Sequence, residues 1–249
     1  MRLVLVLAIV LAATGAAAHV APAIGDNNRY LKLTPLGDRV RLAYTVFYGE
    51  VPGAAMRRAI DANHDGTIDD AESQAFGGRI AREVAAALDV TIDGARRPVA
   101  WAQVVVGFGT AQTAAGAFSI DLVAWLCLAP PRGKHAVLLR DDFRLERPGE
   151  TEVKVEDSPG VAITATRIGG ADDEANDYQL VGPSGALATD GLDLQFTAGD
   201  KAVVTTDAVC RGPAHERALP TGAIAGAAAV AAVLLAGIVT LVRRRRRRA

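Results

Sequence analysis

The chain has 249 residues, of which half are apolar and 22% are charged. This length and composition exclude a wholly disordered chain and fit one domain or two small ones. The formal net charge is −1, but without Arg2 and the block Arg243–Arg248 the remaining 20 basic residues face 28 acidic ones, a net of −8. An anionic domain argues against nucleic-acid binding, and the two cysteines and four histidines form no zinc-like cluster.

The N-terminus has the pattern of a secretory signal peptide. Arg2 precedes an uncharged apolar stretch at residues 3–13, and Ala16 and Ala18 provide the small residues that signal peptidase requires. We therefore expect residues 1–18 to be a signal peptide that is cleaved after Ala18. The alternative is an uncleaved N-terminal anchor, for which the apolar stretch is short.

Residues 19–218 are expected to form an extracytoplasmic, mainly β domain. Residues 39–47 alternate between apolar and polar side chains, which is typical of a half-buried strand, and residues 30–34 form its hairpin partner across a turn at 35–38. Turn residues separate further predicted strands at 90–92, 99–106, 118–128, 136–139, 151–155, 161–167, 192–197 and 202–206, and residues 171–177 are expected to form a loop. This spacing favours an antiparallel sandwich-like fold.

Residues 61–72 match the calcium loop of an EF-hand at each diagnostic position. The expected ligands are the side chains of Asp61, Asn63, Asp65, Asp69 and Glu72 and the backbone carbonyl of Thr67. Calcium takes six to eight hard oxygen ligands, and a tight loop can bring them together from alternate positions. Gly66 provides the sharp turn at loop position 6, and Ile68 holds the loop inward.

We therefore expect an inserted helix-loop-helix EF-hand at residues 52–88, with Ca2+ as the cofactor. The entering helix is predicted at 52–60 and the leaving helix at 69–88, with Gly77–Gly78 as a point where the helix could bend. The alternative is a turn that joins two helices and binds nothing. A single extracellular loop of this kind binds calcium at about 10⁻⁴–10⁻³ M, which favours a structural clamp over a switch.

Cys127 and Cys210 lie in the part of the chain that is expected to be exported. That compartment is oxidising, so the two cysteines could form a disulfide. Two buried, unpaired thiols are the alternative.

The C-terminus has the pattern of a membrane anchor. Residues 220–242 are predicted to form a transmembrane helix, because the stretch from Thr221 carries no charge and would reach about 33 Å as a helix. The arginines of residues 243–249 should stay in the cytoplasm. We therefore expect a single-pass protein of the bacterial plasma membrane with its N-terminal domain outside. A short Leu-Pro-Thr-Gly stretch at 219–222 leaves open the alternative that a sorting system processes the tail.

The order of these features resembles the extracytoplasmic region of bacterial membrane proteins of the nickel/cobalt transporter and hydrogenase/urease-accessory type. The resemblance rests on Ala18-His19, on the strand, helix and acidic loop within 40–72, and on short motifs at 140–142, 147–149 and 159–161. The chain lacks the multi-helix permease of those proteins. The resemblance therefore implies an accessory role beside a membrane transporter or another envelope protein.

No common catalytic motif is present in the sequence, so we do not expect an enzyme. The sequence favours a membrane-anchored calcium-binding module that acts as a binding or accessory protein. The alternative is an accessory protein that handles nickel, cobalt or copper. In that case cleavage after Ala18 would expose the amino group and imidazole of His19 together, and His135 or His215 could add a ligand. An ordinary exposed N-terminal residue is the simpler interpretation of His19.

Overall fold

The computed structural model describes residues 24–172, 179–182, 185–205 and 209–210. The chain divides into two compact units, Met1–Thr206 and Asp207–Ala249, and the strands and helices described below lie in the first. The predicted signal peptide, His19, the predicted span at 220–242 and the tail at 243–249 lie outside the described residues. In the part of the chain that is described, no helix is both long and apolar enough to cross a membrane.

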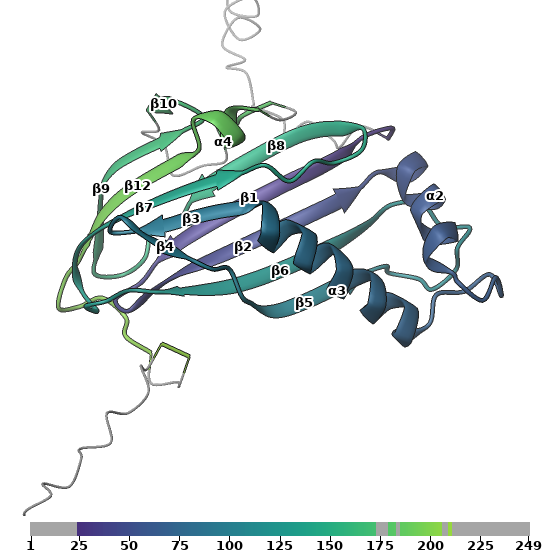
Figure 1. Cartoon of the computed structure of the whole chain (residues 1–249), viewed down its shortest axis with the longest axis horizontal. Coiled ribbons are helices and arrows are strands. Elements are labelled where there is room, and N and C mark those ends of the chain that lie inside the picture. The colour runs from purple at the N-terminus through teal and green to yellow at the C-terminus, as the bar shows by residue number, and fades with distance from the viewer. Residues whose placement is uncertain (1–23, 173–178, 183–184, 206–208, 211–249) are drawn as a thin grey trace, which may run out of the picture. The chain divides into compact units, whose positions relative to one another are not determined.

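The first unit is mainly β, as predicted, and consists of two six-stranded sheets (Figure 1). The first sheet has the strand order β11 (Gln179–Leu180), β8 (Pro148–Val155), β1 (Asn27–Pro35), β2 (Arg39–Tyr48), β6 (Phe118–Cys127) and β5 (Trp101–Gly107). The second has the order β10 (Ala171–Asp172), β9 (Val161–Ile168), β12 (Leu192–Ala198), β7 (Gly133–Asp141), β3 (Leu88–Ile92) and β4 (Ala95–Arg97).

Among the described strands, every pair is antiparallel except one. Strand β8 runs parallel to β1, with Leu31 opposite Val153, which corrects the expectation of an antiparallel sandwich. The chain reaches β8 from β7, which belongs to the other sheet, and not through a hairpin with β1. The alternation of apolar and polar residues shows which face of a strand is buried, but it carries no information on the direction of the neighbouring strand.

Most predicted strands are present within a few residues of the expected bounds, and the β1–β2 hairpin is confirmed. The strand predicted at 202–206 is wrong over its described part. Residues 202–205 pack against the β1–β2 turn instead: Gly37 donates its N–H to the Val203 carbonyl, and Thr205 donates to the Asp38 carboxylate. Residues 171–172, predicted as loop, form β10, while 173–178 lie outside the described residues.

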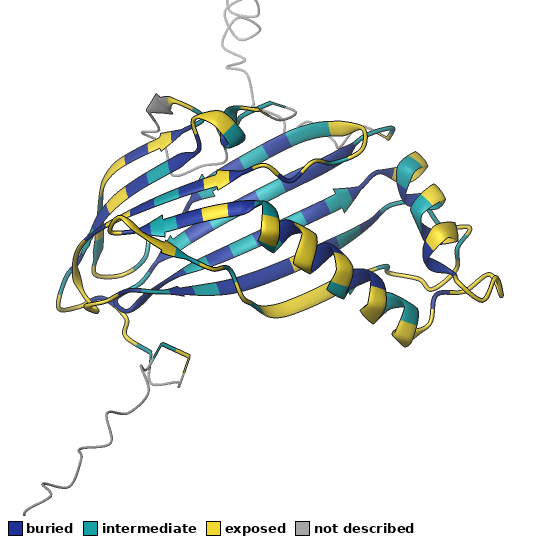
Figure 2. Cartoon of the chain, viewed as in Figure 1, coloured by how far each residue is buried: buried dark blue, intermediate teal, exposed yellow. Residues whose placement is uncertain are grey.

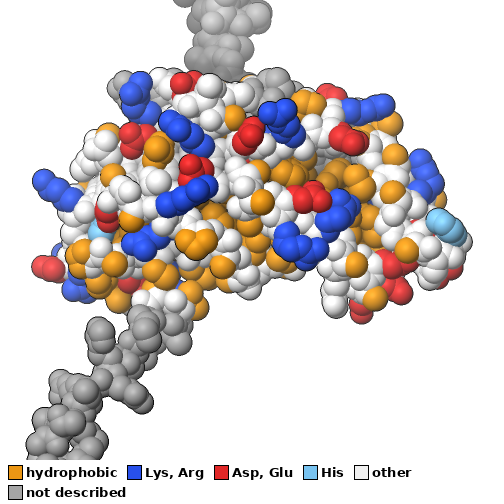
Figure 3. Space-filling model, in the orientation of Figure 1, with side chains coloured by type: hydrophobic (Ala, Val, Ile, Leu, Met, Phe, Trp, Pro, Cys, Tyr) orange, Lys and Arg blue, Asp and Glu red, His pale blue; other side chains and the backbone are white. Residues whose placement is uncertain are grey.

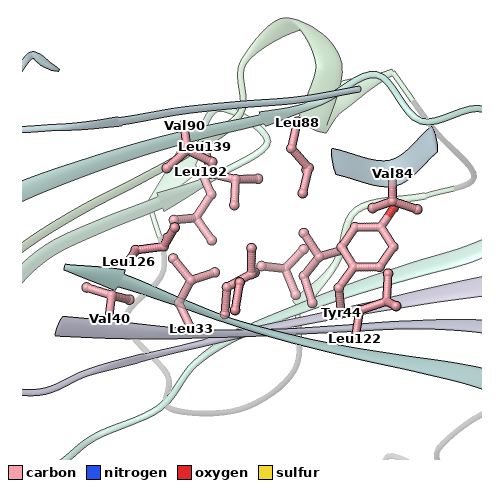
Figure 4. Packing of buried hydrophobic residues seen from close by; sticks show 14 of the residues in the cluster. Leu33, Val40, Tyr44, Val84, Leu88, Val90, Leu122, Leu126, Leu139 and Leu192 are labelled. Carbon is pink, nitrogen blue, oxygen red and sulfur yellow. The ribbon is translucent and has the colours of Figure 1, made fainter. Parts of the chain in front are cut away.

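The core lies between the two sheets and is closed on one side by a helix (Figure 4). Leu33, Val40 and Leu122 reach it from the first sheet, and Val90 and Leu139 reach it from the second. Figure 2 shows the corresponding bands of buried residues along the strands, with α3 (Asp70–Ala87) exposed on its outer side. The other helices within the described residues are α2 (Glu50–Ile60) and α4 (Ala186–Thr189).

Helix α3 packs closely on the edge strand β5. A Cβ atom at Gly77 would lie 2.8 Å from Val106 Cγ2, so glycine permits this approach. The helix continues through Gly77 and Gly78 without interruption and leads directly into β3. The packing against β5 gives a physical reason for Gly77 in the middle of a helix, where glycine is otherwise unfavourable.

Cys127 and Cys210 are disulfide-bonded, which confirms the predicted pairing. Cys127 is the last residue of β6, and Cys210 follows the described stretch 185–205.

Candidate functional site

Residues 61–69 join α2 to α3, and the predicted loop at 61–72 ends within the first turn of α3, so the predicted helix-loop-helix arrangement is present. Two residues of the loop have left-handed backbone conformations, His64 with φ of 61° and Gly66 with φ of 87°. Glycine adopts this region without the steric cost of a side chain. The glycine at loop position 6 therefore provides the sharp turn that the sequence predicted.

Three of the predicted ligands are connected by hydrogen bonds within the loop. The carboxylate of Asp61, which is 5% exposed, accepts hydrogen bonds from the backbone N–H groups of Asp65 at 3.2 Å and Gly66 at 3.0 Å. Asn63 accepts from the Asp65 N–H at 2.9 Å and donates its amide to the Asp65 carboxylate at 3.0 Å. These contacts connect the three residues with one another through the backbone and side chains of the loop.

Hydrogen bonds from Thr67 favour the ionised form of Asp65. The Thr67 hydroxyl donates to Asp65 Oδ1 at 2.6 Å, and the Thr67 N–H donates to the same atom at 2.8 Å. The bond from the hydroxyl, followed by the one from the backbone, lowers the pKa of Asp65 below its ordinary value. Asp65 is therefore a carboxylate at neutral pH, which is the form that binds a cation.

Asp69 and Glu72 form a capping box at the start of α3. Asp69 Oδ1 accepts from the Glu72 N–H at 2.8 Å, and Glu72 Oε2 accepts from the Asp69 N–H at 3.1 Å. Glu72 Oε1 also accepts from the N–H of Ala62 at 2.7 Å, at the other end of the loop. The Glu72 carboxylate thus lies between the two ends of the loop and draws them together.

The side chains are not arranged as a metal cage in this conformation. Among the described residues, no group of three or more His, Cys, Asp or Glu side chains is placed to hold a metal ion. The carboxylates of Asp61 and Glu72 are hydrogen-bonded to the loop's own amides instead. Even so, the six predicted donors lie in a single loop and all offer oxygen, which is the ligand type that calcium selects.

The loop also contacts the connection between β5 and β6, residues 108–117, which the sequence did not predict. Ile68 donates its N–H to the Ala111 carbonyl at 2.8 Å, and Thr113 donates its N–H to the Gly66 carbonyl at 3.0 Å. Thr67 and Gln112 form the β-bridge between these two bonds. Backbone groups make this contact, and they are the same in every residue type, so no sequence signal marks it.

Arg57 of α2 is a second feature that sequence reasoning missed. The residue is fully buried, and its guanidinium donates to carbonyls of the 108–117 connection at 2.5–3.3 Å, namely those of Phe108, Thr110, Gln112, Gly116 and Ala117. It lies over the rings of Phe108 and Phe118, at 5.0 and 5.4 Å from their centroids. Burial lowers the pKa of Arg57 from its usual value, but a guanidinium stays charged in proteins.

The surface around the loop is acidic. Figure 3 shows acidic side chains gathered beside the junction of α2 and α3. Asp61 is buried, whereas Asn63, Asp65, Asp69 and Asp70 are exposed. The exposed carboxylates give this part of the surface a negative charge, which attracts cations.

Of the three histidines named for the transition-metal alternative, His135 lies within the described residues. This residue is buried, with Nδ1 2.8 Å from Asp93 Oδ2 and Nε2 2.8 Å from the Arg132 carbonyl oxygen. Both ring nitrogens are therefore engaged within the protein and are not free to bind a metal. His19 and His215 lie outside the described residues.

No protein-family model matches this chain, and no curated protein sequence does so either. The assignment of a function therefore depends on the chain's own residues.

Proposed function

We propose that this chain is a calcium-binding protein of the extracytoplasmic face, held at the membrane by a single C-terminal span, and that residues 61–72 form its EF-hand. The observation that carries the proposal is the closed loop. A buried Asp61 carboxylate at the start and the Glu72 carboxylate at the end are both hydrogen-bonded to the amides of the loop. The loop therefore holds its first and last predicted ligands against its own backbone, and its six predicted donors all offer oxygen, the ligand type that calcium selects.

Six residues of the loop would each supply oxygen ligands to the calcium ion. Asp61, Asn63, Asp65 and Asp69 would supply side-chain oxygens, Thr67 its carbonyl, and Glu72 both carboxylate oxygens. When bound, calcium supplies the positive charge that holds these oxygens in place. The capping box at Asp69 and Glu72 couples the loop to the first turn of α3, so bound calcium would also stabilise this helix.

The disulfide between Cys127 and Cys210 supports a location outside the cytoplasm. Disulfides persist in oxidising compartments and are rare in the cytosol. Together with the predicted signal peptide and the predicted span at 220–242, it favours a domain exposed on the outer face of the plasma membrane. Such a domain would act as a binding or accessory module for another envelope protein, such as a transporter.

Calorimetric titration of the purified full chain with calcium tests the proposal. We expect one site per chain with a dissociation constant of about 10⁻⁴–10⁻³ M, and weaker binding of magnesium, because magnesium gives up its waters reluctantly. Glu72→Gln should weaken calcium binding strongly, because it removes a bidentate ligand. Glu83→Gln provides a matched control on the same helix outside the loop. An absence of binding at several times 10⁻³ M calcium, about the weakest affinity of such loops, would refute the proposal.

A further inference from the structure

We propose that residues 108–117, the connection between β5 and β6, hold the calcium loop in its binding conformation. In this proposal Arg57 is the positioning residue, because it couples the connection to the loop. This inference rests on the proposed calcium function. It adds a partner for the loop from within the same chain, at a place where the sequence offers one calcium loop and no second one.

The first link is the backbone pairing between the loop and the connection. The bonds from Ile68 to Ala111 and from Thr113 to Gly66 hold loop positions 6 and 8 against the connection, and the Thr113 hydroxyl adds a bond to the Gly66 carbonyl at 3.1 Å. Ile68 is also 6% exposed and belongs to the core. The centre of the loop is therefore held both by backbone hydrogen bonds to the connection and by the buried side chain of Ile68.

The second link is the guanidinium of Arg57. The connection carries little regular structure of its own, and Arg57 gathers five of its carbonyl groups around one side chain. Each bond to a charged donor is stronger than a neutral one. Gly53 and Gly116 permit the close approach of α2, because a Cβ at Gly53 would lie 2.6 Å from the Gly116 carbonyl oxygen.

Together, these contacts connect helix α2, residues 108–117 and the calcium loop to one another. Arg57 lies one helical turn before Asp61, and the Asp61 N–H donates to the Arg57 carbonyl at 3.1 Å. The path runs from Arg57 to the connection, from the connection to Gly66 and Ile68, and from there through the loop back to Asp61. A displacement of the connection must therefore move the centre of the loop relative to its first ligand.

Such coupling is reciprocal, which gives two measurable effects. A change at Arg57 should weaken calcium binding although Arg57 offers no ligand oxygen. Calcium in turn should protect the backbone amides of 108–117 from hydrogen exchange. A side chain with a purely structural role would change the melting temperature but would not make the protection of this segment depend on calcium.

The experiment compares Arg57→Lys with Arg58→Lys in the purified full chain. Lysine keeps the charge at position 57, but its ammonium group cannot reproduce the planar set of N–H donors of a guanidinium. Arg58 is exposed on the same helix and provides the matched control. We expect Arg57→Lys to lower the calcium affinity about tenfold, a usual size for coupling between two sites, and Arg58→Lys to leave it unchanged. Hydrogen exchange of the wild type should show slower exchange of the Ile68 and Thr113 amides when calcium is added.

The outcomes separate this inference from the calcium function. If the wild type binds no calcium, both the calcium function and the coupling are refuted. If the wild type binds calcium and a folded Arg57→Lys binds it equally well, the calcium function stands and the coupling is wrong. If Arg57→Lys fails to fold, the hydrogen-exchange measurement decides: exchange in 108–117 that does not change with calcium overturns the coupling.

Discussion

Arg29 of β1 and Asp141 of β7 form an ion pair that crosses the core between the two sheets. Their side chains are 2% and 0% exposed, and the Tyr44 hydroxyl donates to the same Asp141 oxygen at 2.9 Å. Burial raises the pKa of Tyr44 well above its ordinary value, so the hydroxyl remains a donor at neutral pH. The two sheets are thus connected by a buried polar contact.

Replacing Asp141 by asparagine should be strongly destabilising. The change leaves the Arg29 charge buried without its carboxylate, which typically costs about 3–5 kcal/mol of unfolding free energy. Asp142→Asn is the matched control, because the side chain of Asp142 is exposed and lies 3.6 Å from Arg144 at the surface. Urea denaturation of both variants measures the difference, and equal losses in the two would contradict this interpretation of the pair.

The two adjacent glycines of α3 should respond in opposite directions to alanine. Gly77→Ala would place a Cβ 2.8 Å from the stiff side chain of Val106 and should destabilise the protein. Gly78 has only the mobile end of Arg82 nearby, at 3.5 Å, so Gly78→Ala should stabilise the helix by about 0.5–1 kcal/mol. Thermal unfolding of the two variants gives the sign of each change, and the same sign in both would show that α3 does not pack on β5 in this way.

Asp69 should stabilise the protein even when no calcium is present. Asp69→Ala removes the N-cap of α3 and should cost about 1 kcal/mol in the presence of a chelator. Asp69→Asn keeps a side-chain acceptor for the Glu72 N–H, so it should retain most of that stability while losing a charge. Chemical denaturation in chelator distinguishes the two roles; a loss in Asp69→Asn as large as in Asp69→Ala would mean that the charge, and not the cap, is responsible.

The stability of the domain should fall in acid partly through Asp93. Partial burial alone would raise the pKa of Asp93, but hydrogen bonds with His135 and the Ala136 N–H outweigh it and hold the pKa below 3.8. A carboxyl whose pKa is lower in the folded state contributes stability above the unfolded pKa and loses it as the pH falls through the folded value. Its contribution is therefore present at pH 5 and disappears as the pH drops below 3.8.

Urea unfolding of wild type and Asp93→Asn at a series of pH values measures this contribution. Asparagine tolerates the left-handed backbone of position 93, where φ is 52°, so the variant tests the charge and not the turn. We expect the variant to be less stable at pH 5, and the gap to the wild type to shrink as the pH falls. A gap that stays constant with pH would show that the ionised carboxylate is not the source.

The sequence predicted those features that local residue patterns encode. The alternation at 39–47 located β2, and the oxygen-bearing residues at 61–72 located the junction of α2 and α3. The short strand β4 (Ala95–Arg97) was not predicted, because it has three residues and two of them are arginines. The strand predicted at 202–206 had a suitable pattern, but contacts with Gly37 and Asp38 determine its conformation over the described residues.

The contacts around the candidate site could not be predicted in the same way. The bonds from Ile68 and Thr113 use only backbone groups, and Arg57 looks in sequence like any other arginine on an amphipathic helix. Of the short motifs behind the resemblance, Asp141 belongs to the buried ion pair, and Gly160 has a φ of 76° and lies against Lys201 and Ala202. Both residues therefore have structural roles that any protein with this packing would require.

The direct join of α3 to β3 limits how the chain can change in length. Helix α3 ends at Ala87 and β3 begins at Leu88, with Leu88, Val90 and Ile92 facing the core. One inserted or deleted residue here would exchange the inward and outward faces of β3, which would bring Asp89 and Thr91 into the core, or would rotate α3 by about 100° away from β5. Evolution can therefore replace side chains between Gly77 and Ile92, but it cannot add or remove residues there without rebuilding both contacts.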